Sequence, residues 1–400
     1  MKKVLFAILI SVFVVPVLFW SADVSAQPNF ARKYGTSCNT CHAGFPTKNA
    51  FGEAFKANGY RWPGGEDKAK TKIDVTEMGA EAYKKEFPNS IWPSDIPSIA
   101  PFAVWVRGSL LEWDEEVTLA DGTVEDEVLD WGGPSTGSIL VGGTLGENLG
   151  ILGVMQASRG DFRTFLRAQW MFAPGISLSL GNANSFWQRG SALSTYAGVF
   201  PSPDTGLEVN IVRGQEGGYN IVGGVSNAGG SNGKNLTDAR YFRAKYKFGG
   251  SGLLSGAGGT MGNPYIGLDN NVQIGASFFQ YADDAVRGGG NYAGESTFYG
   301  ADLSGNYGSF TGGVAVSRMH DLDMVNMRAD AGYFFYPWLK GSLRYSSYRD
   351  GENPALSGGL TAHIRPNVSI GASYSHPTKS LAPDGDENQD SFRLNVGAAF

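Results

Sequence analysis

Residues 391–400, SFRLNVGAAF, alternate between two kinds of side chain, and this alternation decides the fold. The apolar members are Phe392, Leu394, Val396, Ala398 and Phe400, and between them lie Arg393, Asn395, Gly397 and Ala399. Successive side chains of a β-strand point to opposite faces of a sheet, so this segment predicts a strand with one apolar and one polar or small face.

The same period of two recurs in residues 242–248, 325–333 and 368–375. Roughly ten-residue segments of this kind, separated by turns and edged by aromatic residues, are typical of a transmembrane β-barrel. A soluble β-sandwich alternates in the same way and is the alternative. The glycine content (57 of 400 residues), the terminal aromatic Phe400 and the export signal described below favour a barrel in the bacterial outer membrane.

We count about sixteen antiparallel strands from residue 101 to residue 400. They are expected to begin near Phe102, Ser135, Leu149, Arg163, Ile176, Gly206, Gly218, Tyr241, Asn271, Ser296, Phe310, Met324, Lys340, Pro354, Val368 and Ser391. Long loops should alternate with short periplasmic turns. Residues 249–270 break this rule, because the connection is long yet falls on the periplasmic side. Either a pair of strands is miscounted there or the loop has a role of its own.

The N-terminal residues have the pattern of a signal peptide covering residues 1–26. Lys2 and Lys3 precede an uncharged apolar run over residues 4–20, and small residues at 24–26 suit a cleavage site. A retained membrane helix is the alternative, but the run is slightly short of the ~20 residues needed to span a bilayer and contains Pro16. The sequence therefore predicts export.

Residues 38–42, Cys-Asn-Thr-Cys-His, form a C-x-x-C-H motif for covalent attachment of one haem c. Cys38 and Cys41 would add to the haem vinyl groups, and His42 would bind the iron as proximal ligand. The alternatives are a redox-active cysteine pair or half of a zinc site. Zinc would need two further ligands, and residues 27–100 contain no other Cys or His.

Residues 27–100 predict a small, mostly helical monohaem cytochrome c domain and linker before the barrel. Residues 49–58 have helical spacing, with an apolar face that suits packing against a porphyrin. Met78 is the candidate distal iron ligand, and the alternatives are an ordinary surface or core methionine, an open sixth site, or His363. His363 faces the lumen by strand parity and could bind the iron only if this domain plugs the pore. His320 and His376 are expected in ordinary loops.

The N-terminal segment resembles the fused monohaem cytochrome–porin family, outer-membrane proteins of iron-oxidising bacteria that take electrons from extracellular ferrous iron. The matching residues are Pro28 to Arg32, Tyr34-Gly35, the cysteine motif, Phe45-Pro46, Phe51-Gly52, Phe55-Lys56 and Gly59-Tyr60. Lys48 departs from the apolar residue expected at its position. The resemblance covers residues 28–62 closely and the remainder only in architecture. It implies that Cys38, Cys41 and His42 hold the haem and that ferrous iron is the electron donor.

The expected function is therefore an iron(II) oxidase or cytochrome oxidoreductase that passes electrons from ferrous iron to a periplasmic soluble cytochrome. Outer-membrane lipid should surround the barrel, and a formal charge of −6 gives no basis for nucleic-acid binding. The alternatives are a solute porin with a haem-containing plug or sensor, a conduit for another donor, and a haem enzyme. Acidic residues from 114 to 130 would gather divalent cations or would form a solvated loop.

Overall fold

The computed structural model describes residues 29–44, 47–72, 74–77, 81–86, 95–97, 101–118, 124–145, 148–158, 161–182, 205–227, 239–257, 261–281, 296–320, 324–347, 354–365, 367–378 and 390–399. The expected signal peptide (residues 1–26), Met78 and Phe400 lie outside these described residues.

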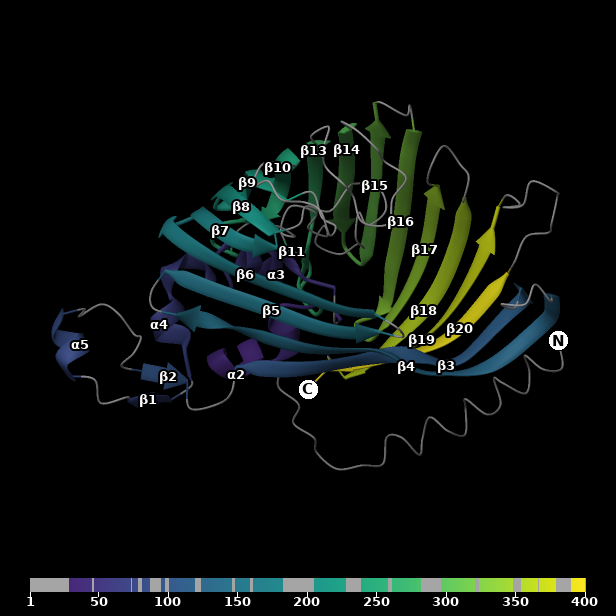
Figure 1. Cartoon of the computed structure of the whole chain (residues 1–400), viewed down its shortest axis with the longest axis horizontal. Coiled ribbons are helices and arrows are strands. Elements are labelled where there is room, and N and C mark those ends of the chain that lie inside the picture. The colour runs from purple at the N-terminus through teal and green to yellow at the C-terminus, as the bar shows by residue number, and fades with distance from the viewer. Residues whose placement is uncertain are drawn as a thin grey trace.

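Sixteen antiparallel strands close into one barrel, as the sequence predicts (Figure 1). The last strand, β20, pairs with the first barrel strand, β3, so no edge is left open. The strands are β3 (Phe102–Thr118), β4 (Val124–Leu145), β5 (Leu149–Ser158), β6 (Asp161–Ala173), β7 (Ile176–Asn182), β8 (Thr205–Arg213), β9 (Glu216–Ser226), β10 (Ala239–Ser251), β13 (Asn271–Tyr281), β14 (Ser296–Tyr307), β15 (Phe310–Met319), β16 (Met324–Tyr336), β17 (Leu339–Ser347), β18 (Ala355–Arg365), β19 (Val368–Pro377) and β20 (Ser391–Ala399).

The predicted start of one strand, β4, is wrong. β4 begins at Val124 rather than near Ser135, because the acidic segment before Gly132-Gly133-Pro134 also pairs with β3. The register shifts between Arg107 and Gly108, opposite this Gly-Gly-Pro segment. A β-bulge accommodates proline and glycine without ending the strand, which the composition alone did not indicate.

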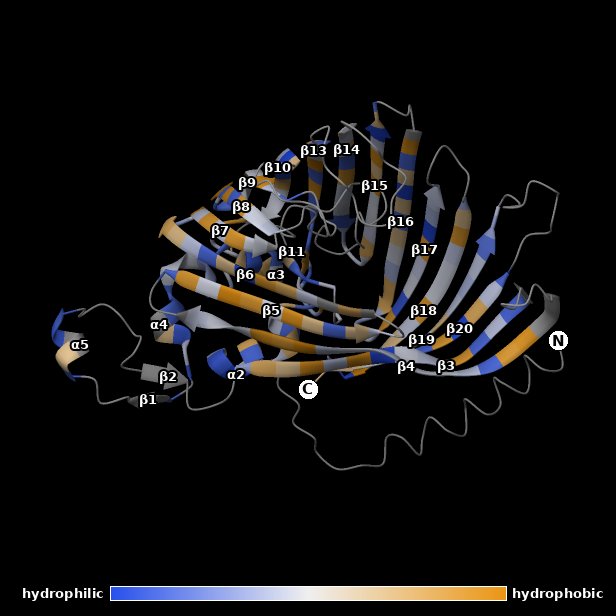
Figure 2. Ribbon diagram, in the orientation of Figure 1, coloured by the Kyte–Doolittle hydropathy of each residue, from blue (hydrophilic) through white to orange (hydrophobic). Residues whose placement is uncertain are grey.

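The barrel is apolar outside and polar inside. On β8, Leu207 and Val209 are 43% and 45% exposed, whereas Glu208 and Asn210 between them are 1% and 4% exposed. Figure 2 shows the resulting alternation of apolar and polar bands along the strands. This is the reverse of a soluble β-sandwich and suits an apolar solvent around the barrel.

The N-terminal unit contains short helices rather than the mostly helical domain that was predicted. They are α2 (Asn29–Tyr34), η1 (Cys38–Thr40), α3 (Ala50–Ala57), η2 (Pro63–Gly65), α4 (Asp67–Lys70) and α5 (Glu81–Glu86). The predicted helix at 49–58 is confirmed as α3, where the Asn49 side chain accepts a hydrogen bond from Gly52 N at 3.0 Å and so caps the N-terminus. Among the described residues, no helix has the length and apolar character to cross a membrane.

The described residues between 29 and 72 lie against the inner wall of the barrel and partly plug it at one mouth (Figure 1). Asn29 Nδ2 donates to Gly142 O at 2.9 Å, and Lys33 Nζ donates to Thr144 Oγ1 at 2.8 Å. Both acceptors lie near the end of β4, at the mouth that carries the two-residue connections 174–175, 214–215, 308–309 and 337–338. By contrast, α5 and the two-stranded antiparallel sheet of β1 (Val75–Glu77) and β2 (Asp95–Pro97) stand apart from the barrel.

The long connection between β10 and β13 packs against this plug. Asn58 Nδ2 donates to Leu254 O at 2.9 Å, and Ala50 N donates to Gly267 O at 3.4 Å. The connection also forms a small hairpin from β11 (Met261–Asn263) and β12 (Leu268–Asp269). The predicted count of sixteen strands was therefore correct. The long periplasmic connection at residues 249–270 has a role of its own, because it holds the N-terminal unit.

Candidate functional site

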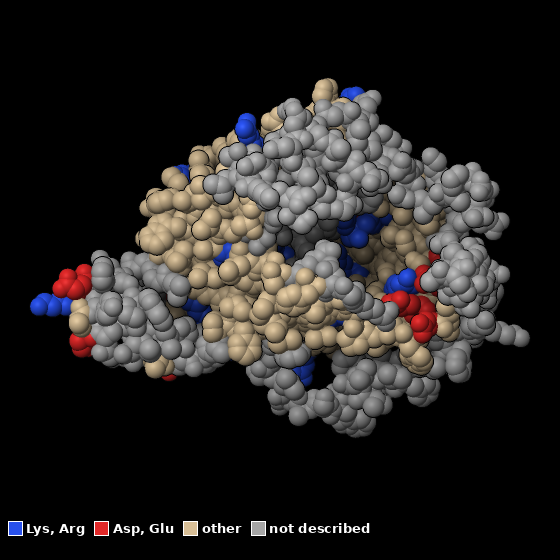
Figure 3. Space-filling model, in the orientation of Figure 1, with Lys and Arg blue, Asp and Glu red and all other residues tan. Residues whose placement is uncertain are grey.

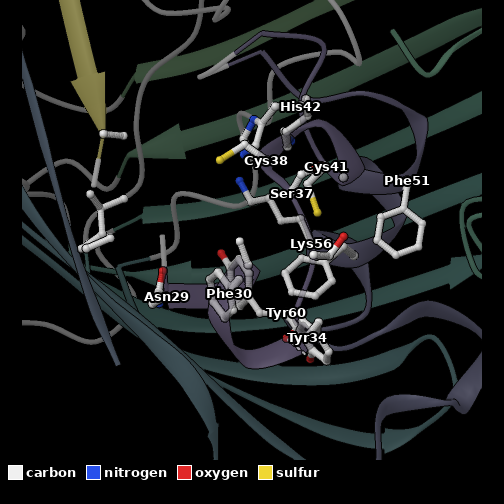
Figure 4. A pocket seen from close by; sticks show the side chains of 18 of the residues that line it. Asn29, Phe30, Tyr34, Ser37, Cys38, Cys41, His42, Phe51, Lys56 and Tyr60 are labelled. Carbon is white, nitrogen blue, oxygen red and sulfur yellow. Dashed lines mark hydrogen bonds between the residues drawn. The ribbon is translucent and has the colours of Figure 1, made fainter. Parts of the chain in front are cut away.

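A single 3₁₀ turn brings together the three residues of the C-x-x-C-H motif. Cys41 N and His42 N both donate to Cys38 O, at 3.1 and 2.9 Å. Both cysteines are free thiols and half-buried. Figure 4 shows Cys38, Cys41 and His42 on one side of a cavity, opposite the rings of Phe30, Tyr34 and Tyr60.

The cavity has a volume of about 190 Å³ and a largely apolar wall that includes six aromatic side chains. Phe51 and Trp62 meet at a centroid distance of 4.8 Å, and the rings of Phe30 and Phe55 meet at 5.2 Å. The barrel completes the wall with four small or aliphatic residues from β3, β4, β5 and β20, namely Ala103, Leu140, Leu152 and Ala399. The pocket is therefore shared between the plug and the inner face of the barrel.

Helix α3 is fixed directly against the cysteine motif. Asn49 N donates to Cys41 O at 2.9 Å, and Asn49 Nδ2 donates to Asn39 O at 2.8 Å. A Cβ atom at Gly52 would lie only 2.1 Å from Cys41 O, so a glycine is needed at this crossing. These contacts set the direction in which the two thiols enter the pocket.

The surroundings of the thiols argue against a redox-active cysteine pair. Burial raises the pKa of the Cys38 thiol, and burial together with the nearby Cys38 raises the pKa of the Cys41 thiol to about 12. Reactive C-x-x-C pairs instead have lowered pKa values that favour the thiolate. Within the described part of the chain, no three His, Cys, Asp or Glu residues group as a metal site.

A polar cluster around Asp67 anchors the far side of the aromatic wall. Its carboxylate lies 3.2 Å from Lys33 Nζ and 3.7 Å from Arg61 Nη1, and it accepts hydrogen bonds from Tyr34 Oη and Trp62 N. Burial acts to raise the pKa of Asp67. The interactions with Lys33, Tyr34, Trp62 and Arg61 lower this pKa by more than burial raises it. The net pKa therefore lies below the usual range.

The predicted site residues have three different outcomes. Cys38, Cys41 and His42 line one pocket, and Lys48 lines it as well. His363 does face the lumen, as strand parity predicts, but it lies against Gly44 and is not among the residues that line the pocket. Met78 lies outside the described residues, so its candidacy as distal ligand stays a prediction.

Sequence reasoning missed part of the pocket wall. Tyr34, Tyr60 and Trp62 belong to it, and the high density of aromatic residues between 30 and 62 could have indicated this. Nothing in the sequence indicated that Ala399 contributes to the pocket wall, because this contribution depends on where the last strand meets the plug.

The acidic segment is partly described, and its described members are engaged with neighbours. Arg393 lies 2.9 Å from Asp114 and 3.9 Å from Glu112, and Glu115 Oε2 accepts from Asp390 N at 3.2 Å. His376, which was expected in an ordinary loop, instead lies at the end of β19, where Nδ1 is 2.5 Å from Asp390 Oδ1. Asp121 and the side chains of Glu116, Glu125, Asp126 and Glu127 are not described. Figure 3 shows acidic side chains on the right-hand rim of the hollow and on the part that projects at the left, and basic side chains within the hollow.

No protein-family model and no curated protein matches this chain. Solved structures that resemble it include an anion-selective porin from Comamonas acidovorans (10% identity, TM-score 0.49, 75% of this chain and 98% of that one). A mutant of the Rhodopseudomonas blastica porin is similar at 12% identity and a TM-score of 0.44, covering 75% of this chain and all of that one (100%). The assignment of a closed barrel rests on the strand pairing in this chain.

Proposed function

We propose that this protein is an outer-membrane electron conduit that oxidises extracellular ferrous iron and delivers the electron to a periplasmic soluble cytochrome. One covalently attached haem c would occupy the pocket between plug and barrel. The observation that carries the proposal is the convergence of Cys38, Cys41 and His42 on an aromatic cavity inside a barrel mouth.

The residues of the pocket fit a haem. Cys38 and Cys41 would hold it through thioether bonds, and His42 would bind its iron. Phe51, Phe55 and the other aromatic side chains would cover the macrocycle and exclude water. When bound, the haem supplies a one-electron redox centre between the lumen and the periplasm.

The proposed direction of electron flow and the proposed electron donor follow from chemistry at the cell surface. Ferrous iron that loses one electron becomes ferric iron, which precipitates at neutral pH, so a cell gains by keeping this product outside. A barrel provides a lined passage through the apolar layer, and the mouth with short turns faces the periplasm in barrels of this kind. The plug would then present the haem to a periplasmic acceptor.

Anaerobic mixing of the oxidised, detergent-purified protein with ferrous iron tests the proposal. We expect the haem absorption bands to become reduced at a rate that rises with iron concentration. The double variant Cys38→Ala, Cys41→Ala should carry no covalent haem, and a Ser37→Ala variant serves as a control with the motif intact. Spectra that stay oxidised at every iron concentration would contradict the assignment of ferrous iron as donor.

A solute porin with a haem-containing plug is the second candidate, and a specific observation supports it. The lumen retains a cavity of about 580 Å³ lined by β3, β4 and β17–β20, beside the plug residue Thr47. A solute porin would conduct ions in a planar bilayer with the haem in place. A tightly plugged conduit would not.

A further inference from the structure

The second cavity, which we call the lumen cavity, has an unusual set of charges. The ionisable residues that line it are Arg107, Lys340 and His363. Among the described residues of its wall, none is Asp or Glu. Arg107 is held in place by Trp105, whose ring centre lies 4.8 Å from the guanidinium carbon.

The remaining wall is rich in hydroxyl and amide side chains. Hydroxyl and amide side chains from both sides of the barrel seam point into the same space, and they include Ser109, Thr136, Ser342, Thr361, Ser373 and Asn395. Some of these groups bond to one another, since Ser109 Oγ donates to Asn395 Oδ1 at 3.1 Å and Asn395 Nδ2 donates to Ser373 Oγ at 3.0 Å. Positive charge from Arg and Lys beside polar side chains is an arrangement that binds carboxylate and phosphate groups. A bare divalent cation would meet like charge there.

Elsewhere in the described lumen, three buried cations are each paired with a carboxylate, and Arg328 and Arg344 share Asp330. Arg167 lies 2.8 Å from Glu208, Arg243 lies 2.6 Å from Asp302, and Lys247 lies 2.6 Å from Asp269. All six side chains are almost fully buried. The wall of the lumen cavity differs from these pairs, because its described residues include the cations Arg107 and Lys340 but no carboxylate.

The lumen cavity borders the pocket that contains the cysteine motif. Trp105 lines the lumen cavity, and its cross-strand partner on β20, Ala399, lines the pocket. On the plug side, Thr47 contributes to the lumen cavity and the adjacent Lys48 contributes to the pocket. An anion bound in the lumen cavity would therefore lie directly beside the haem pocket.

We propose that the lumen cavity is a binding site for a small oxyanion bearing carboxylate or phosphate groups. Resting on the proposed function, we further assign the electron donor as ferrous iron complexed by such an anion. The complex carries the oxyanion that Arg107 and Lys340 recognise, and it brings iron to a place from which the free cation is repelled. The complexed iron would be oxidised from ferrous to ferric, a ferric haem held in the adjacent pocket would accept the electron, and the ferric complex would return to the outside.

Calorimetric titration of the oxidised, haem-loaded protein with inorganic phosphate and with citrate, at low ionic strength, tests the site. We expect saturable binding that weakens as salt is added, and at least a tenfold loss of affinity in the double variant Arg107→Gln, Lys340→Gln. The control variant Lys70→Gln removes one exposed positive charge outside the cavity and should bind as the parent does. Absence of saturable binding, or equal affinity in the double variant, would overturn the site.

Reduction kinetics then test the donor separately. Ferrous citrate should reduce the haem at least tenfold faster than aqueous ferrous iron, and the double variant should lose this advantage while covalent haem content stays unchanged. Equal rates for the two donors would overturn the anionic donor but leave the conduit. If neither donor reduces the haem while both anions still bind, the proposed function fails and the oxyanion site stands.

Discussion

Gly52 lies where α3 touches the cysteine motif, and this contact makes the position sensitive. In Gly52→Ala, the new Cβ would clash with Cys41 O, so α3 must move away from the motif. We expect a loss of about 1–3 kcal/mol in stability and incomplete haem attachment. Pyridine haemochrome assay and thermal unfolding measure both. Gly137→Ala is the matched control, because no atom lies within 4 Å of the added Cβ.

Asp67 makes the stability of the plug depend on pH. Its folded-state pKa lies below the ordinary value of 3.8, so its charge stabilises the fold above that pH, and the contribution is lost as pH falls through the folded pKa. Asp67→Asn should cost about 1–3 kcal/mol at pH 7, since Lys33 and Tyr34 lose a charged partner. Thermal unfolding of both proteins at pH 7 and pH 3 provides the measurement. A gap in melting temperature that does not narrow at pH 3 would contradict this role.

At the scale of elements, the β10–β13 connection holds the plug in place through hydrogen bonds. In Asn58→Leu, the side-chain amide no longer donates to Ala54 O and Leu254 O, and both bonds are under 3 Å. We expect a loss of about 1–3 kcal/mol, together with more frequent opening of the barrel mouth. Single-channel recording should then show higher ion conductance than in the parent. Equal conductance with a lowered melting temperature would mean that the plug stays seated without these hydrogen bonds.

Elements also differ in how far sequence predicts them. Strand alternation was sufficient for the count of sixteen, because each face of a barrel strand meets one kind of surroundings along its whole length. The start of β4 was not predictable from composition. Its acidic residues and Pro134 are unusual in a strand, and they belong to β4 because they pair with β3. The motif predicted that Cys38, Cys41 and His42 would act together. The parts of the pocket wall that Leu152 and Ala399 supply were not predicted, because they depend on packing between segments far apart in the sequence.

At the scale of the whole molecule, the apolar outer surface is the feature that requires a membrane. Val272 on β13 is 49% exposed between neighbouring outward-facing residues, so Val272→Arg would place a charge in lipid. We expect a cost of about 2–4 kcal/mol near the middle of the bilayer and less near its surface. Folding into lipid vesicles, followed by the gel mobility of unheated samples, measures this effect. Tyr265→Arg, at a position 82% exposed in the β10–β13 connection, should fold as the parent does.

The meeting of β20 with β3 has a consequence for biogenesis. Strand β20 both seals the barrel against β3 and provides Ala399, part of the wall of the cysteine pocket. The pocket is therefore incomplete on any nascent or truncated chain that lacks residues 391–399. If the proposed haem is attached to Cys38 and Cys41, closure of the seam afterwards would enclose it between plug and barrel. Maturation would then follow an order, with covalent attachment of the haem first and membrane assembly second.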